Sequence, residues 1–284
     1  MIPSYIREPN GKIYVNPVKR HVKPFWLTTD PEVTVLEAAG TPGDTVETEI
    51  DIDTRGHFEW IYNQNYSLGD YLILIKDVNT GRDLMNRPIH IRTLASLALS
   101  GQRPFKLPES YFFNTEEAGR SVKVQMTNLE AFPNQVKFVM HGRRWYHKEA
   151  PPEVQYAIQK RFGFRERTYA YWIGPKDPYP TIAALGTATV RFSATDAADS
   201  EISKLTLVST GAFTFRLRER ASSKTLMNGT VHSSVGFGTG EFPFIWAETL
   251  LLERNYDLDL EMTDISGAPN TIYPTLTARR LQYA

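Results

Sequence analysis

Cysteine is absent from the 284 residues of this chain. Its absence excludes disulfide bonds, thiolate zinc sites and cysteine nucleophiles together, and it fits assembly in a reducing cytoplasm. The sequence also lacks a long apolar run, and its first residues lack the basic start and apolar segment of a signal peptide. We therefore expect a protein that has no membrane partner.

An excess of charge of one sign is also missing. Lysine plus arginine and aspartate plus glutamate both number 32, so the formal net charge is +0 and the pI is about 7.0. Nucleic-acid-binding proteins normally carry a basic face or a high pI. This balance predicts no sequence-specific nucleic-acid partner.

Motifs of common catalytic sites are not found. The sequence has no Gly-x-Ser-x-Gly elbow, no His-Glu-x-x-His and no EF-hand loop, and the glycine-rich segment 236–240 lacks the lysine of a phosphate loop. No pair of carboxylates suggests glycoside hydrolysis. We therefore predict that the chain is not an enzyme and has no catalytic residues, no cofactor-binding residues, no cofactor and no metal.

What is present is an internal repeat. Segments of the first half recur in the second half in the same order and at nearly constant spacing, among them Trp26-Leu27 with Trp172-Ile173, Glu109 with Glu248, and Arg143-Arg144 with Arg279-Arg280. The repeat signature comprises Asn86, His90, Pro104 and Phe105 in the first half and Asn228, His232, Pro243 and Phe244 in the second. Such a match indicates a duplicated domain.

Each half consists of short runs rich in β-branched and aromatic residues, separated by turn signals, and several runs alternate apolar with polar residues, as in 45–53. The pattern predicts an all-β fold of two tandem antiparallel, jelly-roll-like β-sandwiches joined by a short helical linker. The expected divisions are an N-terminal arm (1–24), the first sandwich (25–146), the linker (147–168) and the second sandwich (169–284).

The linker contains the one expected helix. Pro151 and Pro152 open it, and Val154, Ile158 and Phe162 recur at every fourth position. We expect this helix to pack between the two sandwiches.

The N-terminal arm has no counterpart in the second half. Two interpretations remain open: an ordinary extension of strand and coil, or an arm that reaches a neighbouring subunit. The candidate interface residues of the second interpretation are Tyr5, Ile6, Tyr14, Val15 and Arg20.

Equivalent histidines, His90 and His232, are the strongest site candidates of the repeat. A folding role is the better interpretation, in which each ring closes a turn by hydrogen bonding to the backbone. Asn86 and Asn228 are interpreted in the same way, as side chains that satisfy local backbone groups.

Two other sets of side chains suggest binding. Asp257, Asp259 and Glu261 lie on one face of a strand, which favours a solvated edge over a metal site, because the first repeat has no matching carboxylates. A carbohydrate platform of aromatic side chains is the second idea, although aromatic residues also dominate cores. Its candidates are Trp60, Tyr62, Tyr66, Trp145 and Tyr146.

The segment 80–90, which reads TGRDLMNRPIH, and Gly101-Gln102-Arg103-Pro104-Phe105 resemble a motif of tailed-bacteriophage virion structural proteins. His141-Gly142-Arg143 stands where that group has a final glycine, whereas Lys224, Thr230 and Ala278 depart from the pattern in the second half. The resemblance implies a component of the virion, assembled in the host cytoplasm.

We therefore expect a head-associated structural protein (a minor capsid, decoration or neck/collar protein) that acts through protein–protein contacts. Its expected partners are other virion proteins, from the capsid, portal, neck or fibre, and further copies of itself, because two similar domains in one chain suit a symmetric assembly. The alternative is a module on a tail or fibre that binds glycans or the host surface.

Overall fold

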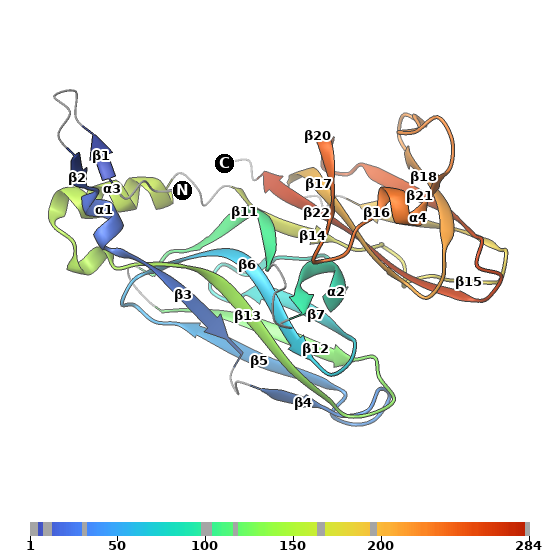
Figure 1. Ribbon diagram of the computed structural model, residues 1–284, viewed down its shortest axis with the longest axis horizontal. Helices are drawn as coiled ribbons and strands as arrows, with labels where there is room; N and C mark the ends of the chain where they lie inside the picture. The colour runs from blue at the N-terminus through green and yellow to red at the C-terminus, as the bar shows by residue number, and fades with distance from the viewer. Residues whose placement is uncertain are drawn as a thin grey trace.

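A computed structural model describes residues 5–7, 13–29, 33–97, 104–115, 119–163, 168–193 and 198–281. It shows two antiparallel β-sandwiches side by side and a small N-terminal unit at one end (Figure 1). The all-β prediction, with tandem jelly-roll-like sandwiches and a helical linker, is confirmed. Residues 101–103 of the phage-like motif lie outside the described residues.

The first sandwich consists of two sheets. One sheet contains β3 (Val22–Thr28), β4 (Thr34–Leu36), β6 (His57–Ser67), β10 (Ser96–Leu97), β11 (Phe105–Phe113) and β13 (Asn134–Trp145). The other contains β5 (Thr45–Ile52), β7 (Tyr71–Asp77), β8 (Arg82–Asp83), β9 (Ile89–His90) and β12 (Arg120–Asn128). In β5 the polar and apolar residues alternate, so its apolar side chains face the core while its carboxylates face solvent.

The second sandwich repeats the main strands of this plan, without strands that match the short β8 and β10 among its described residues. Its first sheet has the order β14-β22-β17-β20, and its second has the order β16-β21-β18-β19. The strands are β14 (Thr168–Ile173), β15 (Thr181–Ile182), β16 (Thr187–Ser193), β17 (Asp199–Ser209), β18 (Phe213–Glu219), β19 (Val231–His232), β20 (Phe244–Leu252), β21 (Asp257–Asp264) and β22 (Asn270–Leu281). Thus β3 corresponds to β14, β11 to β20 and β13 to β22.

A bulge of the same kind occurs in both sandwiches. The register between β6 and β13 shifts at His141/Gly142, and that between β17 and β22 shifts at Ile202/Lys204. A Cβ atom on Gly142 would lie 1.9 Å from the backbone oxygen of Glu59, so only glycine fits this close approach. The corresponding residue of β22 is Ala278.

The linker helix, α3 (Pro152–Gly163), does not pack between the sandwiches as expected. Val154 and Ile158 are buried, but against Val22, Phe112 and Trp145 of the first sandwich. Figure 1 shows α3 beside α1 (Pro17–Arg20) and the hairpin of β1 (Tyr5–Arg7) and β2 (Ile13–Val15), away from the second sandwich. The apolar spacing identified the buried face of α3, but it held no information on which neighbour covers that face.

One continuous apolar core runs through both sandwiches. Trp60 of the first and Trp172 of the second are both fully buried, and their ring centroids are 5.9 Å apart. Burial of aromatic rings at this junction fixes the sandwiches against each other. Among the described residues, none of the helices has the length and apolar character needed to cross a membrane.

Candidate interaction surface

Strand β14 of the second sandwich closes the side of the first. The Trp172 N–H donates to the Leu84 carbonyl (3.1 Å), and the Asn86 N–H donates to the Trp172 carbonyl (3.3 Å). Leu84, Met85 and Trp172 are consequently buried. The opening between the two sheets of the first sandwich is thus filled by a strand from the neighbouring domain.

Polar contacts surround this buried strand. The Asn86 amide donates to the Gly174 carbonyl (2.9 Å) and accepts from the Gly174 N–H (2.8 Å). Arg279 lies 3.8 Å from a carboxylate oxygen of Glu109. Asn86 therefore bonds to the other domain, not to local backbone as the sequence led us to expect.

The matching opening of the second sandwich is not filled by any of the described residues. It is a groove of about 360 Å³. Its apolar lining comes from the interior strands and from both rims: Leu205, Phe215, Leu217, Leu226, Met227, Val231, Val235, Phe244 and Trp246. Leu226 is 37% exposed, whereas its counterpart Leu84 is 0% exposed.

Strand β20 forms one rim of the groove and shows the same contrast. In β11 the residues Phe105, Leu107 and Phe112 are buried, but the corresponding Phe244 and Leu251 of β20 are exposed and Trp246 is half-buried. Ile245, next to Phe244, is 64% exposed. Contiguous apolar surface of this kind usually marks a site of interaction. We call the groove and the exposed face of β20 the open edge.

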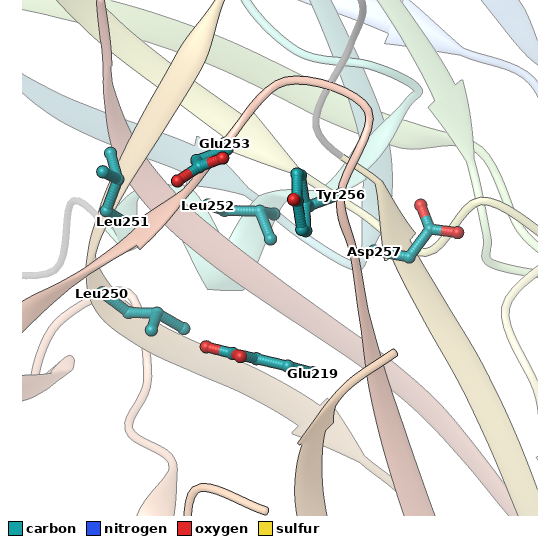
Figure 2. Close-up of a pocket in the computed structure, with 7 residues that line it drawn as sticks. All are labelled: Glu219, Leu250, Leu251, Leu252, Glu253, Tyr256 and Asp257. Carbon is teal, nitrogen blue, oxygen red and sulfur yellow. The ribbon is translucent and has the colours of Figure 1, made fainter. Parts of the chain in front are cut away.

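A second, smaller cavity of about 100 Å³ lies at the far end of β20. Figure 2 shows Glu219 across this cavity from Glu253 and Tyr256, while the carboxylate of Asp257 points away from both glutamates. The Ser222 hydroxyl donates to Glu219 (2.7 Å). Within the described ranges, no three acidic or histidine side chains are grouped so that they could hold a metal ion.

The carboxylate row of β21 is paired with arginines. Asp257 lies 3.5 Å from Arg191, and Glu261 lies 3.2 Å from Arg218. Asp259 lies within 4 Å of both arginines and of Arg220. The row therefore forms an ion-pair network across three strands, which neutralises the carboxylates that a metal would need.

The paired histidines begin two short helices. His90 Nδ1 accepts from the Arg92 N–H (3.3 Å) at the start of α2 (Ile91–Leu94), and His232 Nδ1 accepts from the Ser234 N–H (3.2 Å) at the start of α4 (Ser233–Gly236). Burial, with a smaller contribution from Arg92, lowers the pKa of His90 to about 3. Both rings thus hydrogen bond to nearby backbone, and His90 also lies 3.7 Å from Asp70.

The other signature residues lie along the two rims. Phe105 is buried beneath Lys204, whose ammonium lies 4.4 Å from the ring centroid, whereas Phe244 lines the open groove. Pro104 and Pro243 directly precede them and are half-buried, and Asn228 is exposed. Comparison of the two repeats in the sequence located these positions. It could not show that the other domain covers Phe105 of the first repeat while Phe244 of the second repeat is exposed.

The aromatic platform considered from the sequence is not formed. Trp60 and Trp145 are fully buried core residues, and Tyr66 is the exposed member of the set. Tyr62 and Tyr146 are half-buried. Trp26, which the sequence marked only as part of the repeat, is a tryptophan that is 58% exposed on β3.

The candidate arm residues are described only in part. Tyr5 and Ile6 of β1 pair with Val15 and Tyr14 of β2, and the side chains of these four residues lie outside the described part of the structure. Arg20 is exposed at the end of α1. Their role as an interface stays a prediction.

No family model and no curated protein matches the chain. Solved structures with a similar fold include the major capsid protein P2 of bacteriophage PM2, at 10% identity and a TM-score of 0.44, covering 92% of this chain and 98% of that one. PNGase F, a glycosylasparaginase from Flavobacterium meningosepticum, is similar at 8% identity and a TM-score of 0.39, covering 92% and 97%. PNGF-II is similar at 9% identity and a TM-score of 0.40, covering 94% of this chain and 67% of that chain.

These findings correct the expectation that the chain is not an enzyme. Several of the similar structures are N-glycanases, so an arrangement of this kind also occurs in enzymes. Our expectation depended on short motifs, and such motifs cannot detect a site whose residues come from separate strands. At this level of identity the similarity concerns the fold alone.

Proposed function

We propose that the protein is a structural subunit of a bacteriophage virion and acts by binding other protein chains through its open edge. The observation that carries this proposal is the contrast between the two repeats. The same groove and rim are buried in the first sandwich and exposed in the second. An apolar surface that is covered in one domain, and that no described residue covers in the other, is typical of a site for a partner.

The phage assignment is supported by the resemblance of residues 80–90 and of Pro104-Phe105 to virion structural proteins. A head-associated position, as a minor capsid, decoration or neck/collar protein, is the finer part of the proposal. It suits a duplicated domain, because two similar domains present two similar surfaces to a symmetric assembly.

Cryo-electron microscopy of purified particles tests the proposal. We expect density for both sandwiches at defined, repeated positions, with the open edge covered by another chain. Absence of the protein from the particles, or a position in which the open edge faces solvent, would contradict it. In the second case a screen of the projecting protein against glycans would follow, because host-surface binding was the other function predicted from the sequence.

A further inference from the structure

The contact inside the chain indicates which kind of strand could bind the open edge, because the first sandwich shows what fills the equivalent groove. There the occupant is β14, an edge strand of its sheet, whose Trp172 is fully buried. The corresponding edge strand of the first sandwich is β3. Trp26 pairs with His141 of β13, and Trp172 pairs with Thr277 of β22, so the two tryptophans hold the same place in the two sheets.

Strand β3 is exposed where β14 is buried. Trp26 is 58% exposed, and Pro24 and Lys23 on the same strand are also exposed, whereas Trp172 is fully buried. In Figure 1, β3 lies on the side of the first sandwich that is away from the second. The described part of the chain therefore leaves a groove unfilled in one domain and, in the other domain, exposes the strand that corresponds to the one filling such a groove.

We propose that β3 of a second copy of this chain occupies the open edge, with its Trp26 in the groove beside Leu226 and Met227. This inference rests on the proposed function and names the partner of the open edge. The contact is head-to-tail, because it joins two different surfaces, and repetition of it gives a closed ring or an open chain of copies.

Polar residues around the groove match this arrangement. The Arg279–Glu109 contact inside the chain has its counterpart in Arg143 and Glu248, and Glu248 lines the open groove. Arg143 is in the same register position on β13 as Arg279 is on β22, and each lies near a glutamate of its own sandwich, Glu59 or Glu201. A basic side chain on β13 of one copy would thus approach an acidic one on β20 of the other.

The asparagine contact is matched as well. Asn86 exchanges two hydrogen bonds with the backbone of Gly174, the residue that follows β14. In the proposed contact Asn228, which is exposed, takes the part of Asn86, and Thr28 at the end of β3 takes the part of Gly174. The asparagine side chain bonds only to the backbone N–H and C=O of the residue at the end of the strand or just after it. Threonine has both groups, so a threonine in place of glycine keeps both bonds.

Two variants that each disable one surface test the contact. Trp26→Ala removes the side chain that would fill the groove. Leu226→Lys places a charge in the groove, at a position that is already exposed to solvent. We expect each purified variant to be monomeric at concentrations where the wild type assembles, with a dissociation constant about 100-fold higher or more. Phe132→Ala, which removes another exposed aromatic side chain, is the matched control and should assemble like the wild type.

Mixing the two variants distinguishes a head-to-tail contact from any other. The Leu226→Lys chain retains Trp26 and the Trp26→Ala chain retains an intact groove, so the mixture should form a dimer of one chain of each kind and nothing larger. Glu248→Lys, an exposed change on the rim, should weaken assembly of the full-length chain as a second groove variant.

Three outcomes would overturn the inference: assembly of both variants like the wild type, a mixture that stays monomeric while the wild type assembles, or a groove filled by a different protein in the particles. The first two leave the proposed function intact, because they exclude only a second copy of this chain, and not a different protein, as the partner of the open edge. A wild-type chain that stays monomeric and is absent from particles would instead contradict the proposed function itself.

Discussion

At the scale of single residues, the two equivalent tryptophans have opposite environments. Trp172 is fully buried between the sandwiches, and Trp26 is 58% exposed. Trp172→Ala should therefore lower the free energy of unfolding by about 3–5 kcal/mol, as expected for a large core aromatic. Trp26→Ala should lower it by less than about 1 kcal/mol in dilute solution, because a surface side chain adds little.

Chemical denaturation of the two variants, at protein concentrations below assembly, measures this difference. Similar losses for both variants would show that Trp26 is part of the folded core, and the proposed contact between copies would lose its central side chain.

His57 gives the protein a dependence on pH. Its ring stacks on His147 with centroids 3.8 Å apart, and its Nδ1 accepts from the Thr115 N–H (3.1 Å). Burial, with smaller contributions from His147 and Lys148, lowers the pKa of His57 to about 3. Since the unfolded chain binds this proton near pH 6.5, stability is lost as the pH falls from 6.5 toward 3.

By this linkage, His57 alone should make the free energy of unfolding about 2 kcal/mol smaller at pH 5 than at pH 7. His57→Asn, which keeps an acceptor for the Thr115 N–H, should make the pH profile of denaturation midpoints less steep between these two values. It should not remove the slope, because His90 also has a pKa lowered to about 3. His232→Asn replaces an exposed histidine and serves as the control. An unchanged slope in His57→Asn would contradict a neutral, buried His57.

At the scale of secondary-structure elements, the bulge between β6 and β13 brings one glycine, Gly142, close to the β6 backbone. Because a Cβ on Gly142 would meet the Glu59 carbonyl at 1.9 Å, Gly142→Ala forces the backbone apart and should cost about 1–3 kcal/mol of unfolding free energy. Ala278→Gly makes the reverse change at the matching bulge and should cost about 1 kcal/mol, mainly through backbone entropy. Thermal denaturation of both variants measures the two costs, and a harmless Gly142→Ala would show that the bulge is more open.

The elements were predictable where local pattern decides them. Alternation in 45–53 and the repeat of Asn86 and His90 at Asn228 and His232 led to two tandem sandwiches with the same plan. The partner of an element was not predictable in this way. The spacing of Val154 and Ile158 marks a buried face, yet it could not tell that this face of α3 packs on the first sandwich, because that choice depends on contacts distant in sequence.

The same limit explains what sequence reasoning missed at the site. Trp26 and Trp172 looked equivalent, and Leu84 looked equivalent to Leu226. Only the packing of β14 onto the first sandwich makes one member of each pair buried and the other exposed. The duplication itself carried a usable signal. Two similar domains in one chain form one contact of this kind with each other, so one domain keeps an uncovered groove and the other an uncovered edge strand.

At the scale of the whole molecule, the chain is a pair of domains joined by a contact that can be repeated. The β14 edge of the second sandwich meets the β11 side of the first, which leaves β3 at one end and β20 at the other. Each added copy would cover one groove and present another. Assembly would therefore end only when the copies close into a ring, or continue as a chain.

The measurement that tests this account most directly is the mass of the wild-type protein in solution, determined by sedimentation across a wide range of concentrations. We expect reversible formation of species with two or more copies, each with a mass that is a whole multiple of the 32.3 kDa chain. A folded protein that remains a single chain at every concentration, with Trp26 fully accessible to quenchers of fluorescence, would contradict it.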